Sequence, residues 1–245
     1  SAGCVLANRL SEDATVKVLL LEAGPRDKSM WIDIPAGFTK LLNHQKFNWN
    51  FEMEAEEGMA NRRIPCPRGR ALGGSSSINA MVYIRGHWRD YDDWQAAGNP
   101  GWGWEQVRTA YRAMEDNDVG GNDFRGSGGP LRTTTPDRDL HPLCDPFVKA
   151  AEKTGLRFNP DFNGPGQEGV GYYQLTTRNG RRLSAARAFL RPAMRRKNLR
   201  VETHALVTRI VFDGPRATGV EYEKNGIRHT VRAGREVILS GGAIN

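Results

Sequence analysis

The sequence predicts an α/β fold with a parallel sheet, and three observations favour it. A helical pattern opens the chain and leads into a nearly continuous apolar run at 16–24, VKVLLLEAG, which is typical of a buried parallel strand. A second apolar run at 236–242, EVILSGG, again indicates a strand that ends in glycines. Between them, alternating segments at 199–232 are separated by Asp-Gly and Asn-Gly signals, which predict an antiparallel meander.

Length and composition are those of a folded protein. The chain has 245 residues, of which 38% are hydrophobic and 26% charged, so one large domain or two smaller ones are expected. No apolar run approaches the ~20 residues of a membrane span, and an integral membrane segment is therefore not expected. The opening residues, SAGCVLANRL, lack the basic start and apolar centre of a secretory signal.

The cysteines and histidines give no metal or disulfide pattern. Cys4, Cys66 and Cys144 are odd in number and widely spaced, which favours a reducing compartment and hence a cytoplasmic location. The five histidines stand apart from one another, without the spacing of metal ligands. We therefore expect no metal site.

The net charge of +7 comes from an arginine-rich sequence whose densest part is 181–198. This segment is better interpreted as a solvated helix than as a nucleic-acid patch, because its apolar residues form one face and its basic residues crowd the last turn. Ser184 is the expected N-cap, and Pro192 predicts a kink or a break into two short helices. No nucleic-acid partner is expected.

The rest of the chain predicts a discontinuous organisation. Helices are expected at 1–13, 101–118 and 145–156, the last ending at Gly155. Glycine-rich or mixed stretches at 25–68, 119–130 and 158–171 predict loops, and short strands are expected at 129–136 and 172–180. We predict one domain from residues 1–124 and 184–245, and part of a second domain from 125–183.

The first 24 residues indicate half of a dinucleotide-binding unit. Gly3 lies near the start of the first helix, and Glu22 ends the strand about 20 residues later. In a G-x-G-x-x-G motif, the third glycine allows close helix–strand packing, the helix N-terminus faces a pyrophosphate, and the acidic residue binds ribose hydroxyls. The first strand and first two glycines of the motif would precede Ser1. Alone, this remnant also fits many other α/β proteins.

A longer motif, GRALGGSSSINAMVYIRGHWRDYDDW at 69–94, carries a specific resemblance. It resembles the first signature of the glucose–methanol–choline (GMC) oxidoreductases, a flavoprotein family that includes choline dehydrogenases and related bacterial alcohol dehydrogenases. LLLEAG, RLSAARAFLRPA and VILSGGAIN support the resemblance. It spans the whole chain, which covers about the N-terminal half of such a protein. The matching residues are Gly69, Arg70, Leu72, Gly73, Gly74, Ser75, Ser76, Ile78, Asn79, Tyr83, Gly86 and Asp92.

The resemblance implies an FAD-binding, Rossmann-like domain of the glutathione-reductase type, joined to part of an α+β substrate-binding domain. Gly73 and Gly74 would let the backbone approach the flavin pyrophosphate, and the segment 78–81 would lie along the flavin ring. Val207 resembles the position whose backbone reads the adenine. The implied cofactor-binding residues are Ser1, Ala2, Gly3, Glu22, Ala23, Gly24, Arg70, Gly73, Gly74, Ser75, Asn79, Ala80, Met81, Val82, Val207, Gly241 and Ala243.

One departure from the family pattern is informative. Some members attach FAD covalently through a histidine directly before the signature asparagine, where this chain has Ile78. The resemblance therefore implies non-covalent FAD. The family's catalytic histidine would lie beyond Asn245, so no catalytic residue is assigned in this chain, and the 245 residues alone are expected to be inactive. His87 follows the signature's Gly86 and is not assigned a catalytic role.

The resemblance implies oxidation of a primary alcohol to the aldehyde by hydride transfer to flavin. It also suggests a quinone or respiratory electron acceptor and peripheral association with the inner membrane. Two alternatives stay open: a lyase of the same fold that keeps FAD structurally, and an inactive FAD-binding module. The sequence does not distinguish which alcohol is the substrate.

Overall fold

The computed structural model describes residues 1–136 and 140–245, and these form two compact units. The first unit combines Ser1–Ala80 with Ser184–Asn245, and the second is Met81–Leu183. The compact units and the predicted domains share a bound between Leu183 and Ser184, and the division into domains itself stays a prediction. Residues 81–124, which were predicted to belong with the N-terminal segment, lie in the second unit, because their strands β4 (Val82–Tyr83) and β5 (Glu115–Asn117) pair with strands of that unit.

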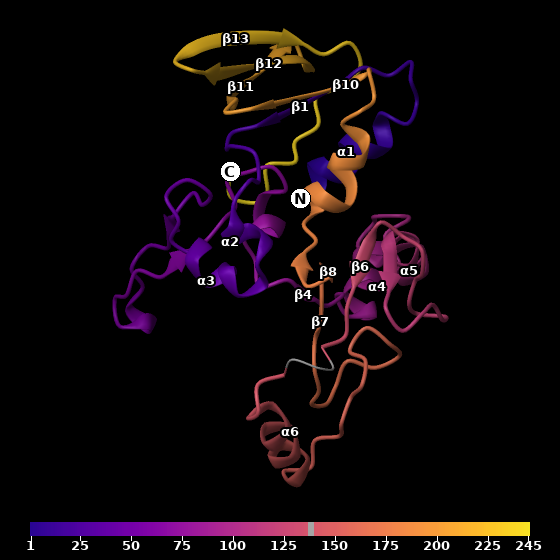
Figure 1. Ribbon diagram of the computed structural model, residues 1–245. Helices are drawn as coiled ribbons and strands as arrows, with labels where there is room; N and C mark the ends of the chain where they lie inside the picture. Colours follow the sequence, from indigo (N-terminus) through magenta and orange to yellow (C-terminus); the bar gives the residue numbers. More distant parts are fainter. Residues whose placement is uncertain (137–139) are drawn as a thin grey trace. The chain divides into compact units, whose positions relative to one another are not determined.

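The first unit, all of which the structure describes, holds three sheets and several short helices (Figure 1). Its elements are α1 (Ala2–Leu10), β1 (Val18–Glu22), α2 (Met30–Asp33), η1 (Pro35–Gly37), α3 (Phe38–Leu41), β2 (Phe51–Glu52), η2 (Glu57–Met59), β3 (Pro65–Cys66), η3 (Gly74–Ser77), the π-helical turn η4 (Ala186–Leu190), α7 (Arg191–Ala193), β10 (Leu199–Thr203), β11 (Leu206–Asp213), β12 (Arg216–Lys224) and β13 (Ile227–Arg232).

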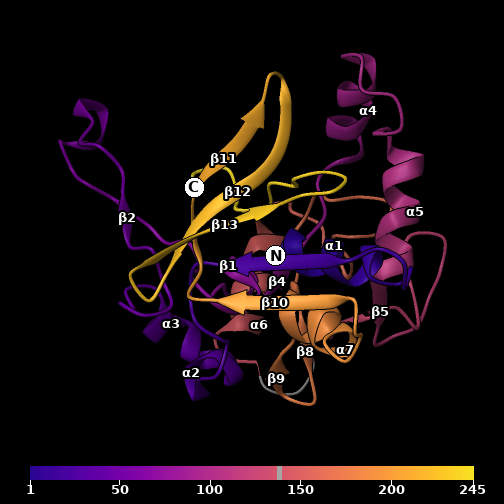
Figure 2. The ribbon, with the colours of Figure 1, turned by 90° about the horizontal axis from the view of Figure 1, so that it is seen from above.

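The predicted first helix and parallel strand are confirmed. Strand β1 pairs in parallel with β10, from Val18 opposite Leu199 to Glu22 opposite Thr203, and Figure 2 shows the two strands side by side. Helix α1 packs close to this pair at Gly3, where a Cβ atom would lie 3.3 Å from Leu20 Cδ1. The strand is less buried than predicted, since Leu19 is 36% exposed and β1 pairs only with β10 among the described residues.

The predicted meander is also confirmed, in the order β11–β12–β13. Gly214 at the first turn has a φ of +55°, and Asn225 and Gly226 at the second turn have φ of +53° and +74°, as the Asp-Gly and Asn-Gly signals require. The segment 199–214 divides in two at His204, whose φ is +57°. Its first half therefore pairs with β1 rather than with the meander.

The predicted strand at 236–242 is wrong. These residues form no strand in the part of the chain that is described, and no neighbouring strand supplies them with ladder hydrogen bonds. A parallel strand forms only where a neighbouring strand supplies its hydrogen bonds. An apolar sequence pattern does not show that such a neighbour is present. The segment nevertheless reaches α1, because a Cβ atom on Gly3 would lie 2.7 Å from Ser240 Oγ.

The basic segment that begins at Ser184 is helical and interrupted, as predicted. The Ser184 hydroxyl accepts a hydrogen bond from the Arg187 N–H at 3.3 Å, so Ser184 caps the turn. The chain winds through one π-helical turn at Ala186–Leu190 and continues as α7. Pro192 lies in α7 and has no N–H to donate to a preceding carbonyl, which accounts for the irregular winding.

Among the residues that the structure describes, the second unit has three helices and several very short strands. The predicted helix at 145–156 is confirmed as α6, which ends at Lys153 with Thr154 as its C-cap, and Gly155 follows with a φ of +97°. The predicted strands at 129–136 and 172–180 are confirmed in shorter form. The elements are β4 (Val82–Tyr83), α4 (Trp88–Ala96), α5 (Trp104–Met114), β5 (Glu115–Asn117), β6 (Leu131–Thr133), α6 (Cys144–Lys153), β7 (Gln174–Leu175), β8 (Thr177–Arg178) and β9 (Arg181–Arg182).

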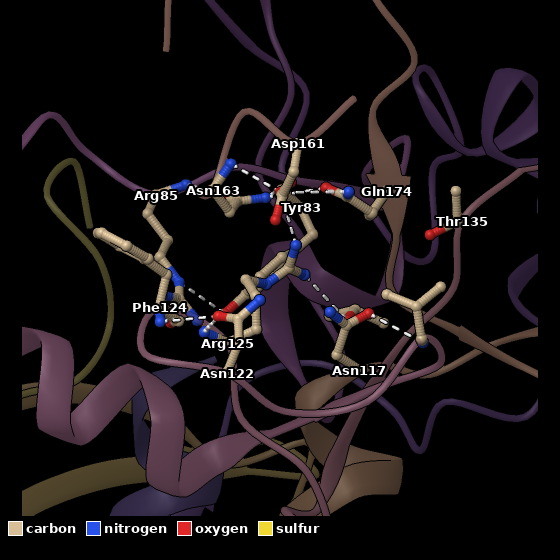
Figure 3. Close-up of polar contacts among 12 residues, drawn as sticks. Tyr83, Arg85, Asn117, Asn122, Phe124, Arg125, Thr135, Asp161, Asn163 and Gln174 are labelled. Carbon is tan, nitrogen blue, oxygen red and sulfur yellow. Dashed lines mark hydrogen bonds and ion pairs between the residues drawn. The ribbon is translucent and has the colours of Figure 1, made fainter. Parts of the chain in front are cut away.

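A buried ionic network forms the centre of the second unit (Figure 3). The Glu115 carboxylate accepts hydrogen bonds from Arg85 Nη2 at 2.7 Å and from Arg125 Nη2 at 2.5 Å. Arg125 also donates to Asp161 at 2.6 Å. The Glu115 and Arg125 side chains are 0% and 1% exposed, so each charge depends on its partner for the solvation that water no longer provides.

We predict that Glu115→Ala destabilises the protein by about 3–5 kcal/mol, because it leaves two buried guanidinium groups without their shared carboxylate. The matched control is Glu221→Ala, which breaks an ion pair with Arg209 that lies at the surface and is expected to cost far less stability than the loss of Glu115. Urea unfolding at pH 7 measures both changes. Equal losses would contradict the assignment of Glu115 as the centre of this network.

Candidate functional site

Several of the predicted site residues of the first unit lie at the N-terminus of α1. The Ser1 hydroxyl donates a hydrogen bond to the Gly73 carbonyl oxygen at 3.1 Å and accepts one from the Ser76 N–H at 3.3 Å. These two bonds join the first residue of the chain to a loop more than 70 residues away. The glycine–serine loop therefore lies directly against the positive end of α1.

Three glycines allow this close packing. A Cβ atom on Gly24 would lie 2.0 Å from the Arg70 carbonyl oxygen, which no side chain could tolerate. Gly73 and Gly74 have φ of +93° and +55°, in the left-handed region that glycine favours. A Cβ atom on Gly74 would also lie 2.9 Å from the Ser1 nitrogen. A side chain at Gly74 would therefore lie in front of the helix N-terminus.

Glu22 lies at the end of β1, beside the same helix terminus. Its Oε1 atom accepts a hydrogen bond from the Gly24 N–H at 2.8 Å. Burial raises the pKa of the Glu22 carboxyl to about 7, against the opposing effects of the Gly24 N–H, the amino group of Ser1 and the guanidinium of Arg70. A half-buried carboxylate at this position can accept hydrogen bonds from the hydroxyls of a ligand.

Arg70 presents an unsatisfied donor near Glu22. Its guanidinium carbon lies 4.8 Å from the centre of the Trp49 ring, and its backbone N–H donates to the Phe47 carbonyl at 2.8 Å. The Nε atom is buried and has no hydrogen-bond partner among the described residues. A buried N–H without an acceptor is uncommon in folded proteins, and it fits a site that receives an acceptor atom from a ligand.

Other predicted residues lie around this centre with different partners. Ala2 is the first residue of α1, and Ala23 lies between Glu22 and Gly24. The Ser75 hydroxyl accepts a hydrogen bond from the Gly69 N–H at 3.1 Å, so it holds the loop together. Ile78 is buried in an apolar cluster with Ile32, Leu41, Phe47 and Ala71.

The remaining predicted residues are more exposed or belong to the second unit. Asn79 and Ala80 are exposed at the end of the glycine–serine segment. Val207 lies opposite Tyr222 in the meander and is 39% exposed. Gly241 accepts a hydrogen bond from the Asn245 side chain at 2.7 Å, and Ala243 lies between them, exposed. Met81 and Val82 belong to the second unit.

His87 has a structural role in the second unit. Its Nδ1 atom accepts a hydrogen bond from the Arg89 N–H at 3.2 Å, and Asp90 accepts one from the His87 N–H at 3.1 Å. These contacts form a capping box at the start of α4. Within residues 1–136 and 140–245, no group of histidine, cysteine and acidic side chains could hold a metal ion. None of the helices described there is long and apolar enough to cross a membrane.

Comparison with known proteins assigns the chain to a family. Residues 2–245 match the family model described as GMC oxidoreductase, and the chain belongs to this family. It is 47% identical to mitochondrial choline dehydrogenase of Mus musculus and 45% identical to alcohol dehydrogenase [acceptor] of Pseudomonas putida, over all of this chain in both cases. The structure is similar to that of pyridoxine 4-oxidase from Mesorbium loti, with a TM-score of 0.90, 36% identity and 95% of this chain covered.

The chain spans less than half of the length of these relatives. It covers 42% of the choline dehydrogenase, 45% of the alcohol dehydrogenase and 46% of the pyridoxine 4-oxidase chain. GMC oxidoreductases are FAD-dependent flavoproteins, and the fold is that of their FAD-binding N-terminal part. The resemblance inferred from the motif at 69–94 is thereby confirmed.

We predict that Glu22 makes the stability of the ligand-free protein fall with rising pH. Its pKa is raised from 4.5 in the unfolded chain to about 7 in the fold, so folding disfavours the ionised form. The free energy of unfolding therefore decreases between about pH 4.5 and pH 7 and is level above that range. Glu22→Gln removes this decrease, and denaturant unfolding at pH 4.5 and pH 8 measures it.

Glu221 provides a control of opposite sign. Arg209 lowers the pKa of the Glu221 carboxyl, so its contribution to stability is present at neutral pH and is lost in acid. Glu221→Gln should therefore reduce the loss of stability in acid, whereas Glu22→Gln reduces the loss of stability between about pH 4.5 and pH 7. A Glu22→Gln variant with the pH profile of the unmodified chain would contradict the burial of this carboxyl.

Proposed function

We propose that this chain is the FAD-binding part of an oxidoreductase that oxidises a small primary alcohol to the aldehyde by hydride transfer to the flavin. The observation that carries the proposal is the convergence of the α1 N-terminus, the Gly73–Gly74 loop and Glu22 in one unit. A helix terminus, an open glycine backbone and a carboxylate are the three groups that bind the pyrophosphate and ribose of a dinucleotide.

The proposed roles follow from the chemistry of each group. The pyrophosphate would lie at the start of α1, facing Ser1, Ala2 and Gly3, and against Gly73 and Gly74. The ribose hydroxyls would donate to Glu22. The backbone at Val207 would contact the adenine. The segment 78–81 would lie along the flavin ring, and Val82, Gly241 and Ala243 are further proposed cofactor-binding residues.

The residues present fit FAD. The buried Arg70 Nε–H lacks an acceptor that an anionic ligand would supply, and the glycine positions leave room that a Cβ atom would fill. Ile78 stands where a covalently attached histidine would precede the signature asparagine, and its buried aliphatic side chain offers no nucleophile. Non-covalent attachment is therefore proposed. Release of all flavin on acid precipitation of the protein would be the expected result.

FAD supplies the hydride acceptor when it is bound. The residues of this chain bind and orient the cofactor, and we assign none of them as the base that accepts the hydroxyl proton. The family relatives named above act, by their names, on choline and on alcohols, which supports a small alcohol as the substrate. A quinone or respiratory acceptor and a cytoplasmic location, peripheral to the inner membrane, complete the proposal.

An anaerobic flavin assay tests this function against its alternatives. The full-length protein that contains this chain should show a flavin spectrum that choline or a simple primary alcohol bleaches without oxygen. A bound flavin that no alcohol bleaches would favour the lyase or the inactive FAD-binding module. Absence of flavin, with none taken up from solution, would overturn the proposal.

We predict that Gly74→Val abolishes flavin retention, because a side chain would occupy the approach of the pyrophosphate. Glu22→Ala should only weaken binding, by about 1.5–3 kcal/mol for the lost charged hydrogen bonds. The ratio of flavin to protein absorbance after dialysis measures both effects.

Gly214 offers a matched control for Gly74. It has the same φ of +55°, but a Cβ atom there would meet no atom within 4 Å. Gly214→Val therefore imposes the same backbone strain at a position away from the proposed site. Loss of flavin in both glycine variants would mean that strain, and not the site, explains the result.

A further inference from the structure

We propose that Arg70 binds the adenosine diphosphate half of the cofactor, and that Trp49 is a positioning residue that holds the Arg70 guanidinium for this contact. The inference rests on the proposed function and deepens it. It assigns a role to Trp49, which no sequence motif singles out, and it specifies which half of FAD the arginine recognises.

The backbone fixes Trp49 and Arg70 relative to each other. The Trp49 N–H donates to the Arg68 carbonyl at 2.9 Å, and the Arg70 N–H donates to the Phe47 carbonyl at 2.8 Å. Between these two bonds, Asn48 and Gly69 form an antiparallel bridge. The two short segments therefore run side by side as a ladder, and the tryptophan and arginine extend from fixed positions on it.

Asn48 reinforces this ladder from within. Its side chain is 2% exposed, and its Oδ1 atom accepts hydrogen bonds from the N–H groups of Arg68 at 2.9 Å and Asn50 at 3.0 Å. Its Nδ2 atom donates to the Leu42 carbonyl. A buried carboxamide that bonds three main-chain groups in this way strengthens the pairing of the two segments.

The side-chain geometry leaves the edge of the guanidinium available. The Cζ atom of Arg70 lies over the Trp49 ring, 4.8 Å from its centre. The guanidinium cation is therefore held against the face of the indole ring by a cation–π interaction. An arginine held in this way keeps its in-plane N–H groups for acceptors. Its Nε is buried without a hydrogen-bond partner, and no ion pair to Arg70 is found within the described part of the chain. The Nε–H therefore lacks an acceptor, and the guanidinium has no direct ion-pair partner among the described residues.

The position of Arg70 indicates that it binds the adenosine diphosphate half of FAD and not the flavin half. Its carbonyl oxygen packs against Gly24, directly after the strand that carries Glu22, and its charge lowers the pKa of the Glu22 carboxyl. Glu22 is the proposed ligand of the adenosine ribose. An anionic, oxygen-rich group next to that ribose is a phosphate of the adenosine diphosphate half, which supplies both an acceptor for the Nε–H and a direct ion-pair partner for Arg70.

The test measures binding of FAD, ADP and riboflavin to the flavin-free full-length protein by titration calorimetry. Arg70→Gln should weaken FAD and ADP by the same factor, about 10-fold to 100-fold, and leave riboflavin binding unchanged. It should also reduce the salt dependence of ADP binding. Arg68→Gln is the matched control, since the Arg68 guanidinium donates to the neighbouring Pro67 carbonyl at 2.7 Å, and it should change none of these affinities.

A double-mutant cycle tests the positioning role. Trp49→Leu should weaken ADP binding about threefold to tenfold in the unmodified protein, and should have no effect in the Arg70→Gln background. Arg70→Lys should recover only part of the affinity, because a lysine does not keep the planar stack. Unchanged thermal unfolding of each variant shows that binding, and not folding, is measured.

The outcomes separate this inference from the proposed function. Additive effects of the two substitutions, or a loss of FAD affinity without a loss of ADP affinity, would overturn the roles given to Trp49 and Arg70 and leave the FAD site in place. Failure of the unmodified protein to bind either FAD or ADP would overturn the proposed function itself.

Discussion

The contact between Ser1, which directly precedes α1, and the Gly73–Ser76 loop is the constraint on which the candidate site depends. Two hydrogen bonds of the Ser1 hydroxyl hold the loop at the helix terminus. Gly73 and Gly74 adopt left-handed backbone conformations there. The helix terminus contributes partial positive charge, and the loop contributes backbone that a ligand can approach without meeting a side chain. The groups available to a ligand at this site are therefore mainly main-chain groups. A single added Cβ atom would alter the approach of a ligand to them.

Electrostatics around this contact are unbalanced in a way that favours an anionic ligand. Glu22 is held at a raised pKa by burial, and Arg70 has a buried N–H without an acceptor. A ligand that carries both hydroxyl donors and phosphate acceptors would satisfy the two side chains together. Glu22 and Arg70, whose hydrogen bonding is incomplete in the ligand-free site, thus define the kind of ligand that the site fits. Because such a ligand would satisfy both side chains, its binding would also stabilise the folded protein.

The second unit is organised by a different principle. Its centre is the carboxylate of Glu115 between Arg85 and Arg125, and the short strands around it contribute little regular pairing. A buried ion cluster of this kind specifies one arrangement, because any other leaves a charge without a partner. Short loops can then be held in place without a long sheet or a large apolar core, as the bonds of Arg125 to Asp161 and of Glu115 to Gly126 illustrate.

The sequence by itself determined the first helix, the parallel strand ending in Glu22, the meander and the family, because periodicity, turn chemistry and a long specific motif are local properties. Only the tertiary structure decided that 236–242 forms no strand, that 81–124 folds with the second unit, and that Trp49 stacks on Arg70. It also decided that Glu115 is buried between two arginines. Each of these depends on partners distant in the chain, and a one-dimensional pattern does not show which partner a strand, a cation or a carboxylate finds.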